Sequence, residues 1–259
     1  GLFVLMMGYF VYFLQAKSKD VINSTYNLRH DVLAKRVTRG MILSADGEIL
    51  AKTVTDDEGN ETRRYPYDDM YAHVVGRVTR GRTGIESTEN INLLTSYENS
   101  PEAIYNDLIG VKNPGNNVIT TLNHKLTKAA YDALGNKTGA VVVIEPATGK
   151  ILAMVSKPSY DPNKIDENWD RLSEDKDNES PLINRATQGL YPPGSTFKVL
   201  TALAYMRENS DYKDFAYNCK GKIEHDGMVI HCSNNKAHGK VDLKKAFAKS
   251  CNTAFSSIG

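Results

Sequence analysis

Ser195 and Lys198 are the pair of residues whose types and setting best suit nucleophilic chemistry. They close the run Tyr191–Lys198, Tyr-Pro-Pro-Gly-Ser-Thr-Phe-Lys, and the eleven residues after Ser195 carry one charge. Residues three apart share one face of a helix, so the lysine amine can reach the serine hydroxyl. Because burial disfavours an ammonium ion, a lysine in a buried apolar helix has a lowered pKa. The pattern predicts that Lys198 is the base that activates Ser195.

The spacing alone is weak evidence, because three other serines in the chain precede a lysine by three residues. Those pairs lie among Glu, Asp, Asn and Lys, where both side chains are expected to be solvated: Ser173 and Lys176, Ser210 and Lys213, Ser233 and Lys236. A purely structural alternative also exists for Ser195, which can cap the helix while Lys198 extends to water. The apolar segment and the Pro-Pro-Gly entry favour the catalytic interpretation.

A second candidate element is Ser250-Cys251-Asn252, which follows the amphipathic stretch 243–249. A hydroxyl and a carboxamide at this position can relay a proton and hold a substrate amide. Ser233-Asn234-Asn235 has the same Ser-x-Asn spacing, so only the position after a helix favours Ser250. A polar cluster at a helix end is the structural alternative.

The overall charge gives no argument for a nucleic-acid partner. Lysine and arginine number 32 against 31 acidic residues, and the net charge of the 259-residue chain is +1. A nucleic-acid-binding surface requires a marked excess of basic residues. We predict no nucleic-acid partner, and a hydrophobic content of 41% predicts a folded chain with room for more than one domain.

The N-terminus carries an uninterrupted apolar run from Leu2 to Leu14, thirteen residues followed by Gln15 and Lys17. A spanning helix needs about 20 apolar residues, so we expect residues 1–16 to be part of a transmembrane helix whose beginning precedes Gly1. A cleaved signal sequence and a buried core helix are the alternatives. A transmembrane helix and a cleaved signal sequence would both place the remainder of the chain outside the cytoplasm. We expect the transmembrane helix, and so a single-pass protein of the cell membrane with its catalytic part outside the cytoplasm.

The three cysteines, Cys219, Cys232 and Cys251, are an odd number without Cys-x-x-Cys spacing. The Asp226-Gly227 pair between the first two is a hairpin signal, so a Cys219–Cys232 disulfide is one interpretation, which leaves Cys251 unpaired.

Histidines in the same segment raise the question of a metal site. Zinc ligands normally occur in pairs two to four residues apart, whereas His231 and Cys232 are adjacent. From this spacing we predict no metal, and the sequence contains no cofactor motif. The other histidines of the segment are His225 and His238.

The chain is predicted to be an α+β protein with three parts: the helix 1–16, an irregular β-rich pedestal at 17–113, and a helix-and-sheet domain at 114–259. A hairpin is expected at 39–51 around Asp46-Gly47, and the run 113–117 contains Pro and Gly and predicts the domain boundary. Thr121 is expected to cap a helix that Gly135 ends, and 139–156 contains two apolar strands that predict a sheet covered on both faces.

Taken in order, these pieces resemble the class B penicillin-binding proteins, the membrane-anchored transpeptidases of peptidoglycan synthesis. The likeness extends through almost the whole chain. The pieces that carry it are the N-terminal apolar run, Arg39-Gly40 with Leu50-Ala51, Gly84-Ile85-Glu86, 139–156, 159–163, Asn184-Arg185-Ala186, Pro193 to Lys198, His238-Gly239 and Ser250-Cys251-Asn252.

The resemblance implies a penicillin-binding and β-lactamase-like fold with an antiparallel sheet. It also implies that Ser195 attacks the carbonyl between two terminal D-alanines of a stem peptide and forms an acyl-enzyme. Lys198 would accept the serine proton, Ser250 would relay protons to the leaving amine, and Asn252 would bind the donor peptide. The backbone N–H of Ser195 would supply part of an oxyanion hole, and β-lactams would acylate the same serine.

The resemblance also implies a third motif, Lys-Thr/Ser-Gly, after the second, and no such tripeptide follows Asn252; Lys137-Thr138-Gly139 has this sequence but precedes Ser195. We therefore expect 114–259 to be the first half of the transpeptidase domain, and the chain by itself to be inactive or barely active. A smaller departure is Ser44-Ala45-Asp46-Gly47, where the family usually has an Asp-Arg-Asn-Gly-like turn.

Three other functions remain open at this point. A serine β-lactamase uses the same serine and lysine but hydrolyses its acyl-enzyme, and it lacks a pedestal. A β-lactam sensor carries further membrane helices, and a non-catalytic scaffold needs none of the chemistry. As partners, the resemblance implies peptidoglycan stem peptides, β-lactams and a membrane glycan polymerase of the shape, elongation, division and sporulation type.

Overall fold

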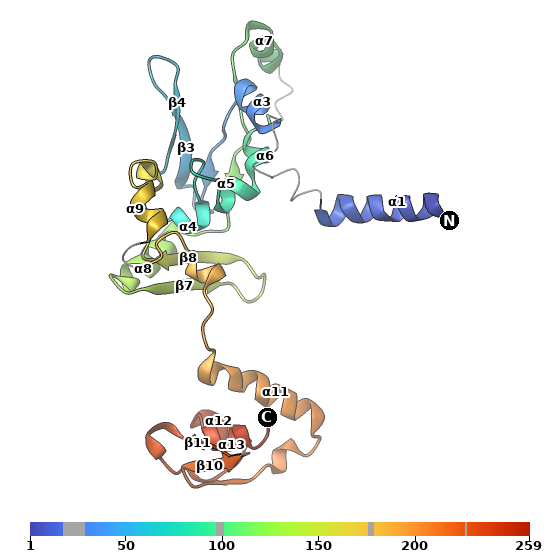
Figure 1. Cartoon of the computed structure of the whole chain (residues 1–259), viewed down its shortest axis with the longest axis vertical. Coiled ribbons are helices and arrows are strands. Elements are labelled where there is room, and N and C mark those ends of the chain that lie inside the picture. The colour runs from blue at the N-terminus through green and yellow to red at the C-terminus, as the bar shows by residue number, and fades with distance from the viewer. Residues whose placement is uncertain (18–28, 97–100, 176–178, 226) are drawn as a thin grey trace. The chain divides into compact units, whose positions relative to one another are not determined.

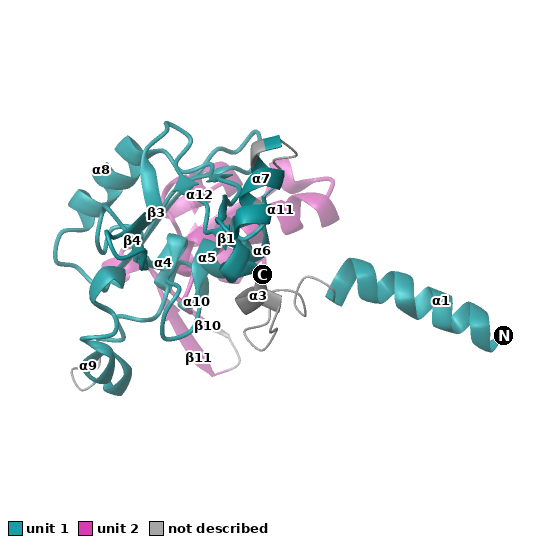
Figure 2. Ribbon diagram, turned by 90° about the horizontal axis from the view of Figure 1, so that it is seen from above, with its two compact units in different colours: residues 1–189 teal, residues 190–259 magenta. Residues whose placement is uncertain are grey.

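A computed structural model describes residues 1–17, 29–96, 101–175, 179–225 and 227–259 (Figure 1). The chain forms two compact units, residues 1–189 and 190–259, coloured separately in Figure 2. The strands after residue 139 pack with the first unit, and the domain boundary expected at 113–117 stays a prediction. Helices and strands occur in both units, so the α+β prediction is confirmed.

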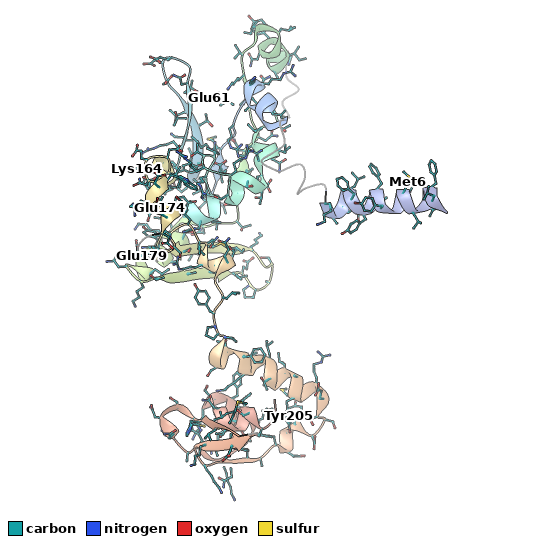
Figure 3. The ribbon with its side chains drawn as sticks, in the orientation of Figure 1. Met6, Glu61, Lys164, Glu174, Glu179 and Tyr205 are labelled. Atoms are coloured by element: carbon teal, nitrogen blue, oxygen red, sulfur yellow. The ribbon has the colours of Figure 1, made fainter. Side chains whose placement is uncertain are left out.

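The N-terminal apolar run forms α1, Leu2–Tyr12, which continues as one wide turn over Phe13–Lys17. No side chain of α1 is buried, and Met6, labelled in Figure 3, is 62% exposed. Among the residues that the structure describes, no helix is both long and apolar enough to cross a membrane.

The first unit is built on a four-stranded sheet with the order β4-β3-β2-β6. The predicted hairpin is confirmed: β2 pairs antiparallel with β3, and Gly47 in the turn between them has a φ of +88°, which favours glycine. β3 continues antiparallel to β4, and β2 also pairs in parallel with β6. The strands are β2 Ile42–Leu43, β3 Ile49–Thr55, β4 Glu61–Arg64 and β6 Val118–Ile119.

The run 113–117 is packed into the fold and is not a free linker. β1, Val37–Thr38, pairs in parallel with β5, Asn113–Pro114, and Asn113 is buried. A side chain on Gly115 would collide with the carbonyl oxygen of Leu93, so only glycine fits this close backbone approach.

The first unit also contains short helices. They are α3 Arg29–Arg36, α4 Ala72–Val75, α5 Gly84–Thr88, α6 Asn90–Leu93 and α7 Pro101–Ile109. Of these, α4 and α6 contribute Val75 and Leu93 to its core. The buried core residues are Ile42, Leu50, Ala51, Tyr65, Tyr71, Val75, Leu93 and Leu122.

Helix α8, His124–Leu134, begins later than predicted. Asn123 is its cap, since the Asn123 side chain accepts a hydrogen bond from the Leu126 N–H at 3.0 Å. Thr121 instead donates its hydroxyl to the Ile151 carbonyl at 2.6 Å, so the prediction of a Thr121 cap is wrong. Gly135 ends the helix as predicted.

The predicted strand pair is present as β7, Gly139–Ile144, antiparallel to β8, Ile151–Lys157. The expectation that both faces are covered is wrong for this chain, because Val142 and Ile144 are 40% and 53% exposed. The polar stretch that follows contains α9, Trp169–Glu174, and α10, Arg185–Gln188. It is anchored by a small core of Ala72, Tyr160, Ile165 and Leu172.

The second unit contains α11, Lys198–Glu208, two short antiparallel strand pairs and two small helices. The pairs are β9 Tyr217–Cys219 with β12 Gly239–Val241, and β10 Lys222–His225 with β11 Met228–His231; the helices are α12 Leu243–Ala248 and α13 Asn252–Ser256. The expected buried helix is not found here, since Leu200 and Leu203 of α11 are 58% and 52% exposed.

Candidate active site

Ser195 lies on a single tight helical turn, Gly194–Phe197, that leads directly into α11. Gly194 has a φ of +56°, a conformation that glycine adopts without steric cost. The Pro193 carbonyl accepts the Thr196 hydroxyl at 2.6 Å, which fixes the turn. Pro-Pro-Gly therefore bends the chain so that Ser195 is presented at the start of the helix, with its side chain exposed.

Lys198 is the first residue of α11, and its Nζ is the hub of the site. Nζ lies 3.3 Å from the Ser195 Oγ, 2.9 Å from both the Ser250 Oγ and the Ser250 carbonyl oxygen, and 2.5 Å from the Asn252 Oδ1. The Ser250 hydroxyl lies 3.0 Å from the Ser195 Oγ. The structure thus brings together all four residues predicted from the sequence, across more than 50 positions of chain.

The end of α12 explains how Ser250 and Asn252 come to face Lys198 together. Ser250 follows the last turn of α12 with a left-handed φ of +49°, and the Cys251 N–H bonds back to the Ala246 carbonyl at 2.9 Å. This reversal resembles the usual glycine-type helix end. The residue between the two, Cys251, is fully buried on the opposite side.

The surroundings of Lys198 make its ammonium group easier to deprotonate than that of a solvated lysine. Burial lowers the pKa of Lys198, and the neighbouring Cys251 and Cys232 oppose this shift. No ion pair of the described residues includes Lys198, so hydroxyl, carbonyl and carboxamide groups alone receive its hydrogen bonds. A lysine held in this way can give up its proton and act as a base.

The competing Ser-x-x-Lys pairs have no such setting. Ser210, Lys213, Ser233 and Lys236 are exposed. Lys176 lies outside the described residues. Structural context therefore separates Ser195 from residues that share its spacing.

A cluster that the sequence argument did not find lies behind Ser250 and Asn252. Cys219, Cys232, His238 and Cys251 each offer one ligand atom, and these atoms all lie within 4.8 Å of one another. Neighbours along the chain lack the spacing of zinc ligands, but the fold joins residues 13 and 19 positions apart. The three cysteines are free thiols, so the disulfide interpretation is wrong for this structure, and Cys251 is not left over.

Hydrogen-bond donors near the Cys219 sulfur favour the deprotonated thiolate form of this residue. Although burial raises the pKa of Cys219, hydrogen bonds from Thr253, His238 and Gly221 lower it to about 6. A chain segment with three thiols and an imidazole at this spacing could hold a thiophilic metal ion.

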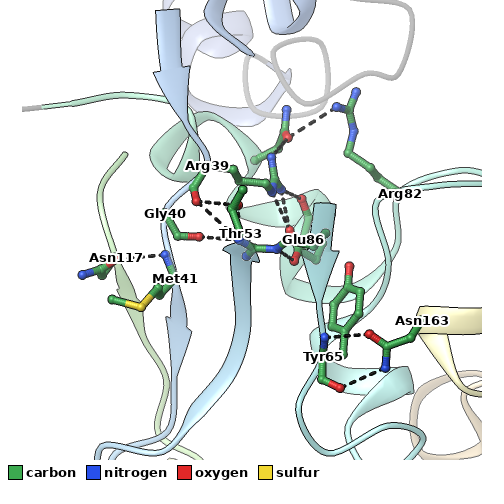
Figure 4. A network of polar contacts seen from close by, with 11 residues as sticks. Arg39, Gly40, Met41, Thr53, Tyr65, Arg82, Glu86, Asn117 and Asn163 are labelled. Atoms are coloured by element: carbon green, nitrogen blue, oxygen red, sulfur yellow. Dashed lines mark hydrogen bonds and ion pairs between the residues drawn. The ribbon is translucent and has the colours of Figure 1, made fainter. Parts of the chain in front are cut away.

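A second buried polar cluster lies in the first unit, around Glu86 (Figure 4). The two Glu86 carboxylate oxygens accept hydrogen bonds from Arg39 and Arg63, each at 2.7 Å, and Glu86 is fully buried. Arg63 also donates to the Gly40 carbonyl at 2.8 Å. The cluster fixes the first hairpin to α5 and offers no nucleophile.

Comparison with known proteins identifies the two parts of the chain. The model of the penicillin binding protein transpeptidase domain matches residues 139–259, and that of the penicillin binding protein A dimerisation domain matches residues 39–118. The D,D-transpeptidase PbpA of Mycolicibacterium smegmatis is 38% identical over 242 residues, which cover 85% of this chain and 49% of that protein. The chain belongs to the class B penicillin-binding proteins.

Other members of this class agree in sequence and fold. PbpA of Mycobacterium tuberculosis is 34% identical over 285 residues, which cover 99% of this chain and 57% of that protein. The imipenem acyl-enzyme complex of penicillin-binding protein A from M. tuberculosis has a TM-score of 0.77 at 33% identity, over 88% of this chain and 56% of that one. The chain therefore spans about half the length of these class B relatives.

Proposed function

We propose that the protein carrying this sequence is a serine D,D-transpeptidase that cross-links peptidoglycan stem peptides. The observation that carries the proposal is the hydrogen-bonded set of Ser195, Lys198, Ser250 and Asn252. A nucleophile, a base within reach and a second hydroxyl in contact with both are the parts that acyl transfer needs. Relatives whose names state the same activity support it.

In the acylation step, the Ser195 Oγ attacks the carbonyl carbon between two terminal D-alanines. The new C–O bond forms while the proton of Ser195 passes to Lys198, which lies 3.3 Å away. When the tetrahedral intermediate collapses, the C–N bond breaks and the leaving amine takes a proton from the Ser250 hydroxyl. Lys198 replaces that proton across the 2.9 Å contact with the Ser250 Oγ.

Deacylation is the same path in reverse. An amine of a neighbouring stem peptide takes the place of the departed D-alanine, gives a proton to Ser250 and attacks the acyl carbon. The C–O bond to Ser195 breaks, and the serine recovers its proton from Lys198. The contacts among Ser195, Lys198 and Ser250 therefore carry the proton in both half-reactions.

Asn252 has a role that goes beyond peptide binding. Its Oδ1 accepts from Lys198, and its Nδ2 donates to the His231 carbonyl at 2.8 Å. Both ends of the carboxamide are thus engaged within the protein. For Asn252 to bind the donor peptide, Nδ2 must exchange the His231 carbonyl for a substrate carbonyl.

The setting of the reaction is part of the proposal. The apolar N-terminal run would anchor a single-pass protein of the cell membrane, with the active site outside the cytoplasm. Stem peptides are the substrates and β-lactams acylate Ser195; a membrane glycan polymerase is the expected partner. The imipenem acyl-enzyme of the M. tuberculosis protein supports the β-lactam part of this assignment.

The test is covalent labelling with a fluorescent penicillin, on the protein at its natural length and on residues 1–259. Peptide mass mapping should place the adduct on Ser195 in the natural protein, and labelling of residues 1–259 should be weak. Ser195→Ala should abolish the adduct. Ser210→Ala is the matched control, because it removes a serine with the same spacing to a lysine, and it should label normally.

Three results would overturn the assignment. An adduct that persists in Ser195→Ala would remove the nucleophile from the proposal. An adduct that forms on Ser195 but is released as fast as penicillin is consumed would make the protein a β-lactamase, since a transpeptidase holds its penicilloyl group. A protein that never labels would be a scaffold.

A further inference from the structure

A cleft of about 400 Å³ in the first unit is lined by residues of α4, α5, β8 and α10 and of the loop after α4. Its lining carries one permanently charged group, the Arg77 guanidinium, and the described residues that line it include no Asp or Glu. The His73 imidazole also lines the cleft, but burial lowers the pKa of His73 to about 4, so this group is neutral at pH 7. The cleft therefore has an unbalanced positive charge.

Arg77 is 7% exposed, and protein groups use only part of its hydrogen-bonding capacity. Nη1 donates to the Tyr160 hydroxyl and Nη2 to the Arg80 carbonyl, each at 3.1 Å, whereas the buried Nε has no partner among the described residues. The guanidinium carbon lies 5.4 Å from the centre of the Tyr160 ring and 5.5 Å from that of the Trp169 ring. A guanidinium has more N–H donors than these two bonds use, and it keeps its proton. Donors and a full positive charge therefore remain for an outside acceptor.

Other arginines of the first unit have carboxylate partners. Arg39 pairs with the buried Glu86 at 2.7 Å, and the exposed Arg80 pairs with Asp166 at 2.7 Å. Arg77 has no ion pair among the described residues, although it is more buried than Arg80. Because a buried charge without a counter-charge is costly, an anion in the cleft would supply the partner that the chain itself does not provide.

Thr83 provides a second unpartnered polar group in the same cleft. Its hydroxyl oxygen is buried and has no hydrogen-bond partner among the described residues. The loop after α4 brings it beside Arg77, since the Thr83 N–H donates to the Arg77 carbonyl at 3.2 Å. A side chain on Gly76 would collide with the Thr83 carbonyl oxygen, so this close return of the chain requires glycine. Buried polar groups nearly always have a partner, and two exceptions that line one cleft point to a ligand.

We propose that this cleft binds a small organic carboxylate, which accepts hydrogen bonds from Arg77 and Thr83. A planar guanidinium matches a carboxylate group in geometry, and charge-assisted hydrogen bonds of this kind are among the strongest in proteins. One cation and an apolar wall favour a singly charged acid with a short carbon chain over phosphate, which carries more than one charge at pH 7. The apolar residues of the cleft are Val74, Ile85, Met154 and Leu182.

A ligand in this cleft would join segments that are far apart in the chain. Asn184, which caps α10, donates its Nδ2 to the His73 carbonyl at 3.3 Å across 111 positions. The Gln188 Oε1 accepts from the Asn184 N–H at 2.9 Å, which leaves the Gln188 Nε2 as a donor at the cleft. A carboxylate held by Arg77 and reached by Gln188 would link the loop after α4 with α10. Because only the folded chain has this cleft, binding should raise the stability of the first unit.

Trp169 gives a local readout of binding. It is the one tryptophan of the chain, and its ring faces the Arg77 guanidinium, so an anion on Arg77 should change its fluorescence. Propionate titrated into residues 1–259 at constant ionic strength should give a saturable change in emission. Propionamide, which has the same shape without the charge, is the matched control and should give none. The melting temperature should rise with propionate concentration and stay constant with propionamide.

Arg77→Lys tests the guanidinium, because lysine keeps the charge but lacks the planar fork. Its affinity for propionate should fall by about tenfold or more, as for lost hydrogen bonds to a charged group. Thr83→Val removes the hydroxyl at nearly constant shape and should weaken binding several-fold. Arg80→Gln is the matched control, since Arg80 lies over the same Trp169 ring at 5.8 Å but is exposed and paired, and its affinity should be unchanged.

An emission change that propionamide reproduces would contradict the site, as would no saturable change with propionate or a normal affinity in Arg77→Lys. Loss of binding in Arg80→Gln would place the anion on the exposed arginine and would also overturn the site. If Arg77→Lys does not fold, Thr83→Val and the two titrations of the unaltered chain decide the question.

The kind of anion is tested with two further compounds. Inorganic phosphate that binds as tightly as propionate would overturn the choice of a carboxylate. N-acetylalanine distinguishes two sources of the carboxylate: tighter binding than propionate assigns it to the end of a peptide, and weaker binding assigns it to a small free acid. None of these measurements uses Ser195, so the cleft and the proposed function are tested independently.

Discussion

The Glu86 cluster is a buried group of paired charges, whereas the Lys198 cluster holds a partly buried ammonium group. In the first unit, one carboxylate is matched by two guanidinium groups, and all three side chains are at most 11% exposed. In the second unit, a single ammonium group is surrounded by hydroxyl, carbonyl and carboxamide oxygens, without a carboxylate partner among the described residues. Both networks join segments that are far apart in sequence.

The difference shows what each network can do. A carboxylate between two arginines keeps its charge in place, because protonating or removing the carboxylate leaves two buried guanidinium groups unpaired. Neutral oxygens stabilise an ammonium less strongly, and burial lowers the pKa of Lys198. The ion pairs of Glu86 therefore favour rigidity, whereas the neutral partners of Lys198 allow its proton to be transferred.

The largest expected effect comes from removing the Lys198 amine, which accepts and returns the proton of Ser195. Lys198→Ala should lower the rate of penicillin acylation at Ser195 by about 10²–10⁴-fold, the usual contribution of a general base. Lys198→Arg should lose a similar factor, because arginine keeps the charge but cannot become a base. The rate is measured by rapid-quench labelling of the natural-length protein.

Lys213→Ala is the control for this prediction, since Lys213 follows Ser210 at the same spacing and is exposed. Its acylation rate should match that of the unaltered protein. If Lys198→Arg acylated at the normal rate, the lysine would act through its charge, and the contrast with Glu86 would fail.

The next effect tests the matched charges of the first unit. Glu86→Gln leaves two buried arginines without a counter-charge and should cost about 3–5 kcal/mol of unfolding free energy. Urea denaturation followed by tryptophan fluorescence measures it, because Trp169, the one tryptophan of the chain, lies in the first unit.

Asp132→Asn provides the comparison with a surface ion pair. Lys128 and Asp132 are paired at 2.7 Å, but both side chains are more than half exposed. The loss of this ion pair should lower the unfolding free energy by about 0.3–0.5 kcal/mol, as for other pairs four residues apart on a helix. Equal costs for the two variants would show that the Glu86 cluster is no more than a set of surface pairs.

The candidate catalytic residues could be predicted because their signals are local. Ser195 and Lys198 are three residues apart on one helix, and Ser250 and Asn252 flank a helix end. The metal-ligating cluster could not be found in this way, since its members come from strand ends and loops that only the folded chain brings together. The relevant histidine is His238, whereas the sequence drew attention to His231 beside Cys232.

The polar contacts that organise the first unit were harder to predict, for a different reason. Glutamate and arginine are rarely fully buried, so Glu86 and Arg63 were not expected to organise the first unit. The hairpin at Asp46-Gly47 and the strand pair after residue 139 were predicted because turn residues and apolar runs are contiguous in sequence. The cap of α8 was misplaced by two residues, since Thr121 and Asn123 are both capping types and only the fold decides between them.

His73 makes the stability of the first unit sensitive to acid. His73 packs edge-on against Tyr160 with ring centroids 5.5 Å apart, and burial lowers the pKa of His73 to about 4. The unfolded chain therefore binds a proton that the folded chain does not, between about pH 6.5 and pH 4. The stability that neutral His73 contributes is fully present above about pH 6.5. It is lost as the pH falls towards 4, and the total loss in unfolding free energy is about 3 kcal/mol.

The measurement is unfolding free energy against pH for the unaltered chain and for His73→Gln. The two curves should converge as the pH falls from 7 to 4, because the variant has no imidazole to protonate and all carboxylate effects are shared. Parallel curves would mean that His73 is protonated in the folded state, and that burial in the first unit does not exclude charge as strongly as Glu86 and its arginines suggest.

The smallest effect concerns neutral hydrogen bonds that join distant parts of the first unit. The Asn163 side chain accepts from the Tyr65 N–H at 2.9 Å and donates to the Tyr65 carbonyl at 3.0 Å, across 98 positions of chain (Figure 4). Asn163→Ala leaves both backbone groups without these partners and should cost about 1–3 kcal/mol of unfolding free energy by the same tryptophan assay.

Asn168→Ala is the matched control, since among the described residues the Asn168 amide donates to the Lys164 carbonyl, four residues away, in an exposed setting. Its cost should stay within about 0.5 kcal/mol, as for ordinary surface changes. If Asn163→Ala cost as little as Asn168→Ala, the rigidity of the first unit would depend on the Glu86 charges alone. A larger cost would mean that paired charges and neutral backbone bonds hold the first unit together, whereas the hydrogen-bond partners of Lys198 in the second unit are all neutral.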